Sequence, residues 1–235
     1  MINNFIYTFL KRKLRKNIPR KGSYNIFCIS MQRTGTTSVG NFFNYFGYPV
    51  AKWRDSWDNY WSMLWYNGDF ESIFNSKEFK SFQVFEDDPW WLPGFYKILF
   101  HRFPTAKFIL FTRDSESWFN SMLSHSKGYT LGNTKLHCKI YRREKEFYDK
   151  LEADASFKSS KDKIDNLLPL AGYKQHYIDL YEIRNREVIN FFEENDSSRL
   201  FHCDLSDSTK WQKLGEFIGI DVPKDFSIHS NKTQK

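Results

Sequence analysis

Three short apolar runs, each followed by polar residues, constrain the fold of this chain more than any other feature. Residues 24–30 lead into a polar turn, residues 82–85 lead into an acidic run, and residues 107–112 (KFILFT) lead into Arg113 and Asp114. Short, uninterrupted apolar runs are typical of strands that are buried on both faces. The sequence therefore predicts several strands of one covered, parallel sheet.

Helical patterns alternate with these strands. Apolar residues recur at helical spacing over 36–46, and further helices are expected over 94–102, from Asp114 or Ser115 through Leu123, near 136–154 and over 172–195. A last strand over 199–203 precedes a helix that Ser206 or Asp207 is expected to cap. This alternation predicts an α/β fold with three layers, α/β/α, around a central parallel sheet. The polar clusters after the strands should then converge at one edge, where such sheets bind ligands.

Charge separates the first residues from the rest of the chain. The 235 residues carry a formal net charge of +7, and residues 1–21 hold seven basic and no acidic side chains. The remainder is balanced at 28 basic and 28 acidic residues, so it does not resemble a nucleic-acid-binding domain. We expect a basic amphipathic N-terminal arm over 1–21 and a single domain over 22–235, with a substrate-side insertion at about 125–170.

The arm suggests a peripheral contact with a membrane. Its apolar residues fall largely on one helical face beside the basic cluster, a pattern typical of helices that lie on anionic membranes. An arm that docks on its own domain or stays disordered is the alternative. The basic block follows the short apolar run, which is the wrong order for a secretory signal. Three cysteines without paired or metal-ligand spacing indicate a reducing compartment. The sequence thus favours a cytoplasmic protein, peripheral at the inner face of a membrane.

The segment from Ser30 to Ser38 (SMQRTGTTS) has the position of a phosphate-binding loop, between a strand and a helix. Backbone N–H groups and the N-terminus of a helix bind phosphate at such a junction. When Gly35 is aligned with the second glycine of a Walker loop, Thr36 occupies the place of the lysine. The cation lies inside the loop instead, at Arg33. The loop is therefore P-loop-like without being a Walker loop.

Two motifs now carry a family resemblance. The stretch from Arg33 to Thr37 (RTGTT) resembles the 5′-phosphosulfate loop of sulfotransferases that use 3′-phosphoadenosine 5′-phosphosulfate (PAPS). The stretch KFILFTRDSESWFNS resembles the family's 3′-phosphate motif, with Arg113 at the strand end and Ser121 in the helix. Asp87-Asp88-Pro89 is similar to an Asp-x-Pro segment of the family. The likeness covers about 24–118 and 199–226, while the C-terminal RKG segment of cytosolic members is absent.

The resemblance implies a bacterial-type sulfotransferase that transfers a sulfuryl group from PAPS to a hydroxyl or amine by in-line displacement, without a metal. It implies Arg33 and Asp87 as catalytic residues. Two rival bases stay open on position alone: Glu86, at the same strand end, and His125, just beyond the helix that carries Ser121. The residues that it implies for donor binding are Arg33, Thr34, Gly35, Thr36, Thr37, Ser38, Arg113 and Ser121. Simpler interpretations are an ordinary capped turn for the loop, a solvated acid cluster at 86–88 and a salt bridge of Arg113 to Asp114.

The acceptor is less constrained. Tryptophan recurs at every fourth position from Trp53 to Trp65, which on one helix forms a stripe that packs in the core or, if exposed, stacks on sugar rings. This favours a glycan or lipid-linked glycan as acceptor. Two other functions stay open: a P-loop nucleotide kinase or NTPase, which needs a lysine after Gly35, and a non-catalytic nucleotide-binding module.

Overall fold

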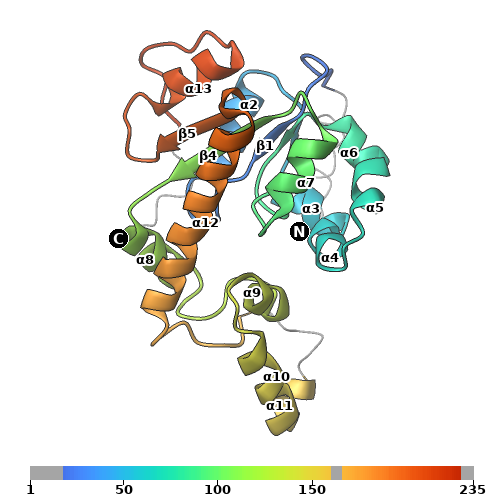
Figure 1. The fold of residues 1–235 in the computed structure, drawn as a ribbon, viewed down its shortest axis with the longest axis vertical. Coiled ribbons are helices and arrows are strands. Elements are labelled where there is room, and N and C mark those ends of the chain that lie inside the picture. The colour runs from blue at the N-terminus through green and yellow to red at the C-terminus, as the bar shows by residue number, and fades with distance from the viewer. Residues whose placement is uncertain (1–17, 160–165, 229–235) are drawn as a thin grey trace, which may run out of the picture. The chain divides into compact units, whose positions relative to one another are not determined.

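A parallel sheet runs through the part of the chain that the computed structural model describes, residues 18–159 and 166–228 (Figure 1). Its five strands, counted over those residues, have the order β2-β3-β1-β4-β5, and all neighbours pair in parallel. The strands are β1 (Ile26–Cys28), β2 (Val50–Ala51), β3 (Val84–Phe85), β4 (Lys107–Thr112) and β5 (Leu200–Asp204).

Contacts divide the chain into two compact units. The first holds the described residues up to Thr112 and those from Phe191 on, and the second runs from Arg113 to Asn190. The helices of the first unit are α2 (Thr36–Tyr45), α3 (Trp53–Asp58), α4 (Trp61–Tyr66), α5 (Phe70–Asn75), α6 (Lys77–Ser81), α7 (Phe95–Arg102) and α13 (Lys210–Ile218). Those that begin in the second are α8 (Ser115–His125), α9 (Thr134–Ile140), α10 (Glu144–Ala153), α11 (Ala155–Ser159) and α12 (Lys174–Asn195), which ends in the first; the 3₁₀ turn η2 (Ser197–Arg199) follows.

Strand alternation gives the sheet two different faces. On one face, Ile26 and Cys28 of β1 join a buried cluster with α2 and α13, in which Phe42 stacks on Trp211 at 5.3 Å between ring centroids. On the other face, Phe27 lies among the rings of Phe79, Phe85, Trp90, Phe103 and Phe108. Helices cover both faces, so the three-layer α/β/α architecture with a parallel sheet is confirmed.

The predicted elements differ from the structure where local geometry interrupts a pattern. The helix expected near 136–154 is two helices, α9 and α10, separated at Arg142, whose φ is 56°. Helix α13 begins at Lys210 and not at Ser206 or Asp207, because the Asp207 carboxylate accepts from the N–H of Thr209 and closes a turn first. Strand β2 was missed, since two residues are too few to form a pattern.

The tryptophan stripe expected on one helix is also interrupted. Tyr60, with φ at 55°, separates α3 from α4. Trp53 and Trp57 are 47% and 54% exposed, whereas Trp61 is 1% exposed and packs in the core. The core and surface interpretations therefore each hold for a different part of the series.

The structure describes only part of the predicted arm and of the predicted insertion. Residues 1–17 of the arm and residues 160–165 of the insertion lie outside the described residues. Among the residues that are described, none of the helices has the length and apolar character needed to cross a bilayer.

Candidate active site

The hydroxyl group of Ser30 anchors the start of the predicted phosphate loop. Ser30 Oγ donates to the carbonyl oxygen of Ile109 at 3.2 Å and accepts from the N–H of Phe111 at 2.7 Å. It thus joins the end of β1 to β4. The chain leaves these two neighbouring strands towards opposite edges of the sheet, which is the point where open parallel sheets bind ligands.

The loop then turns sharply before α2. The hydroxyl and the N–H of buried Thr34 both donate to the carbonyl oxygen of Met31. Arg33 has a φ of 68° and Gly35 a φ of 88°. The positive φ favours glycine at position 35, where a Cβ atom would also lie 2.8 Å from Leu205 Cδ1 and displace that side chain. The tight turn therefore depends on Thr34 and Gly35.

Helix α2 starts without a cap of its own. Gly35 is its N-cap, so no side chain satisfies the first N–H groups, and its first turn contains no acidic residue. Thr36 and Ser38 in that turn are buried, and Thr37 is partly exposed. Uncapped N–H groups and the helix dipole favour an anion at this position. These donors fit a phosphate group, as the sequence predicts.

Three carboxylates follow β3, and their environments differ. Glu86 is buried against α2, where a Cβ atom at Gly40 would lie 2.9 Å from Glu86 Cγ. Asp87 has a φ of 69°, and its Oδ1 atom accepts from the N–H of Asp88 at 3.0 Å. The peptide bond between Asp88 and Pro89 is cis. Glu86 therefore packs against α2, whereas Asp87 lies in the turn that follows β3.

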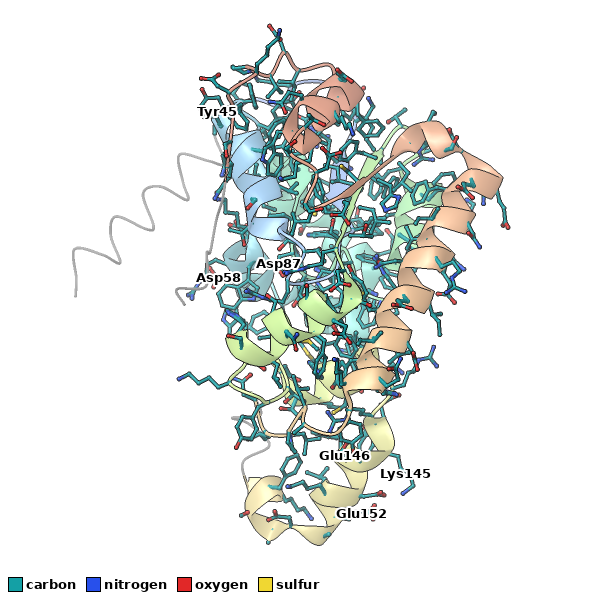
Figure 2. The ribbon with its side chains drawn as sticks, turned by 90° about the vertical axis from the view of Figure 1, so that its left-hand side faces the viewer. Tyr45, Asp58, Asp87, Lys145, Glu146 and Glu152 are labelled. Atoms are coloured by element: carbon teal, nitrogen blue, oxygen red, sulfur yellow. The ribbon has the colours of Figure 1, made fainter. Side chains whose placement is uncertain are left out.

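Protein atoms surround both aspartates and change how they ionise. Loss of solvation raises the pKa of Asp87 to about 6, and the hydrogen bond from Asp88 and the charge of Arg33 partly oppose this. Loss of solvation, and then the charge of Asp87, raise the pKa of Asp88 to about 8. Asp88 Oδ1 is buried and accepts no hydrogen bond from any residue within the described part of the chain. The structure thus brings Arg33 and Asp87 together, and Figure 2 shows Asp87 near the end of α2 opposite Tyr45.

The remaining predicted residues belong to the second unit. Arg113 follows β4, and its N–H and carbonyl groups bond to the hydroxyl of Tyr181 at 3.0 and 3.2 Å. The predicted cap of α8 is confirmed, because Asp114 Oδ1 accepts from the N–H of Ser117 at 2.8 Å. The side chains of Arg113 and Ser121 are partly exposed and that of His125 is exposed, so a ligand can reach all three.

Sequence reasoning missed Lys52. It directly follows β2, whose Ala51 pairs with Phe85, so Lys52 is in register with Glu86. Its Nζ atom donates to Asn41 Oδ1 of α2 at 2.7 Å. A cation directly after a strand was the available signal, but β2 is too short to be recognised as a strand.

The comparisons with known proteins agree with this geometry. A family model described as a sulfotransferase domain matches residues 25–235. No protein with a curated description matches the chain. The matched region spans the sheet, the loop before α2 and the carboxylates after β3. The chain therefore belongs to the sulfotransferase family and transfers a sulfuryl group to an acceptor.

Proposed function

We propose that the donor is PAPS and that the acceptor is a hydroxyl or amine group, in the first instance that of a carbohydrate. The observation that supports this most is that the charge of Arg33 acts on Asp87, with Arg33 in the loop that leads into the uncapped start of α2. A cation for the leaving group and a base for the acceptor are the two groups that the transfer needs.

The loop residues bind and neutralise the 5′ end of the donor. The backbone N–H groups of Gly35, Thr36 and Thr37 lie at the start of α2, where the N–H of Ser38 already donates to the carbonyl oxygen of Gly35. The hydroxyl groups of Thr36, Thr37 and Ser38 add donors. The guanidinium of Arg33 stabilises negative charge as it develops on the leaving phosphate. Arginine stays protonated at all relevant pH values, so this role is electrostatic and not that of a proton donor.

Asp87 is the proposed base. With a pKa of about 6 it is mostly ionised at neutral pH and still able to accept a proton from an acceptor hydroxyl. Glu86 remains a rival, but it is buried against Gly40 of α2. His125 is the third candidate, and it is exposed on the second unit.

Arg113 and Ser121 are proposed to bind the 3′-phosphate, which ATP and AMP lack. An arginine can pair with two phosphate oxygens at once, and a serine hydroxyl adds a third contact. Thr36 at the place of the Walker lysine weighs against the nucleotide kinase alternative. The peripheral membrane contact of residues 1–21 stays a proposal, as does a cytoplasmic location.

The donor is tested by thermal unfolding with PAP, 5′-AMP and ATP. PAP at about a hundred times its dissociation constant should stabilise the protein by about 2.7 kcal/mol, and AMP and ATP by much less. The Arg113→Met variant should lose most of the preference for PAP, whereas Arg186→Met, which removes an exposed arginine of α12, should keep it. Equal stabilisation by PAP and ATP contradicts the donor assignment.

A further inference from the structure

Helix α3 exposes two tryptophans. Trp53 and Trp57 keep about half of their surface in solvent, and their ring centroids lie 5.6 Å apart with an angle of 34° between the planes. Tryptophan is among the residues with the most apolar surface to bury, so two exposed indoles in contact need an explanation.

The helix that carries them is firmly held. The buried carboxylate of Asp55 accepts from the N–H of Lys52 at 2.9 Å and closes the first turn. The carbonyl oxygen of Asp55 accepts from the Asn59 side chain at 2.6 Å. Immediately afterwards Trp61 is buried, with its ring 5.4 Å from that of Trp90. The exposed rings are therefore displayed on a fixed support.

Their place in the sheet puts them beside the proposed base. Ala51 of β2 pairs in parallel with Phe85 of β3, and Trp53 and Asp87 both lie two residues beyond this pair. In the view of Figure 2, Asp58, which is on the same helix as the tryptophans, is drawn next to Asp87. An acceptor whose hydroxyl reaches Asp87 would thus extend along α3.

We propose that Trp53 and Trp57 are the platform on which a pyranose ring of the acceptor stacks, an inference that rests on the proposed function. The C–H groups on one face of a pyranose carry partial positive charge, and the face of an indole is negative. Stacking buries this apolar face and leaves the ring hydroxyls free. One hydroxyl can then be directed to Asp87.

The surroundings fit a sugar better than a protein. Two half-exposed indoles present on the order of 250 Å², well below the roughly 800 Å² that each partner buries in a standard protein interface. Arg54 and Asp58 form an ion pair at 3.0 Å on the same helix, and both side chains keep exposed surface. Charged groups next to an aromatic ring supply the hydrogen bonds that sugar hydroxyls require.

The probes are hexasaccharides of β-1,4-linked glucose and of β-1,4-linked N-acetylglucosamine. Saturation-transfer NMR with the full chain should show transfer to the axial C–H protons of one ring face. The double variant Trp53→Ala, Trp57→Ala should weaken binding at least tenfold, and Trp53→Phe by less. Tyr148→Ala, which removes an exposed aromatic ring from α10, should leave binding unchanged.

PAP stabilisation measured on the same proteins distinguishes a failure of the sugar platform from a failure of the proposed PAPS-dependent function. When PAP stabilises wild type and double variant equally and only the double variant loses the sugar, the platform is supported. When PAP stabilises both but neither hexasaccharide binds, or the double variant binds them as well as wild type, the platform is wrong. Failure of PAP to stabilise the wild type overturns the proposed function itself.

Discussion

Two clusters of desolvated ionisable groups, one around Arg143 and one formed by Asp87 and Asp88, are built differently. In the second unit, Arg143 is 4% exposed, yet its Nε and Nη2 atoms donate to both oxygens of Glu146 at 2.8 Å. Its Nη1 atom donates to the hydroxyl of Tyr177 at 2.9 Å, and its guanidinium stacks on the ring of Tyr173 at 3.9 Å. All three guanidinium nitrogens of Arg143 thus donate to partners within the unit.

His137 completes the closed cluster. Its Nδ1 atom accepts from the N–H of Leu131 at 3.1 Å, so the proton is on Nε2, which lies 2.8 Å from the Tyr177 hydroxyl. Burial, and then the charge of Arg143, lower the pKa of His137 to about 3. His137 is therefore neutral at physiological pH, and its two ring nitrogens both have partners within the unit.

The carboxylates after β3 lack such a complete set of hydrogen-bond partners among the described residues. Loss of solvation raises the pKa of both Asp87 and Asp88, and Asp88 Oδ1 has no hydrogen-bond donor among the residues described. A buried polar group left unsatisfied costs stability. This contrast supports the proposal that the Arg143 cluster stabilises the fold, whereas the aspartates keep an unfavourable arrangement for the proposed reaction.

The largest effect that this comparison predicts is on turnover. Asp87→Asn removes the proposed base and should lower kcat by about 10²- to 10⁴-fold. Because it also removes a desolvated charge, it should leave the free energy of unfolding unchanged or raise it. Sulfate transfer from radiolabelled PAPS and urea unfolding measure the two effects. PAP binding should stay nearly intact.

Asp149→Asn is the matched control, since this carboxylate is exposed on α10. It should change neither activity nor stability measurably. Full activity in Asp87→Asn would move the base to Glu86 or His125, and a large loss of stability would show that Asp87 has a structural role.

The second effect is on stability and should appear only in the closed cluster. Glu146→Ala leaves the buried guanidinium of Arg143 without its counter-ion and should cost about 3–5 kcal/mol in unfolding free energy. Lys145→Ala, on the same helix (Figure 2), breaks only the exposed pair with Asp149 and should change the unfolding free energy far less. Equal costs in urea unfolding would show that the Arg143 cluster does not stabilise the fold as proposed.

The sheet could be predicted from the sequence because strand and helix patterns are local. Strand β4 coincides with the run KFILFT, and the ends of β1 and β3 placed Arg33 and Asp87 at one edge of a parallel sheet. The position of the segment from Ser30 to Ser38 between a strand and a helix indicated a phosphate loop. Each of these inferences uses neighbours in sequence.

The Arg143 cluster could not be predicted, because its members are brought together by tertiary structure. His137 and Tyr177 are 40 residues apart in sequence, and nothing local to either indicates a partner. The break between α3 and α4 at Tyr60 could not be predicted either, because no sequence pattern indicates a positive φ at a tyrosine. The pKa values of Asp87 and Asp88 depend on desolvation, which sequence spacing does not report.

The smallest effect is a difference in how the two clusters respond to pH. The unfolded chain releases aspartate protons near pH 3.9, whereas folded Asp87 and Asp88 hold theirs to about 6 and about 8. Between about pH 4 and 8 the folded state thus binds more protons, so this cluster loses stability as the pH rises. His137 acts in the opposite direction, because its lowered pKa makes the folded state bind fewer protons than the unfolded chain below about pH 6.5.

Asp88→Asn removes the part of the stability loss that comes from Asp88, so the unfolding free energy of this variant relative to wild type should increase from pH 5 to 8. Urea unfolding across that range measures this difference, and Asp149→Asn should show none. A constant difference for Asp88→Asn would mean that Asp88 is solvated like a surface carboxylate, and the contrast between an open and a closed cluster would no longer hold.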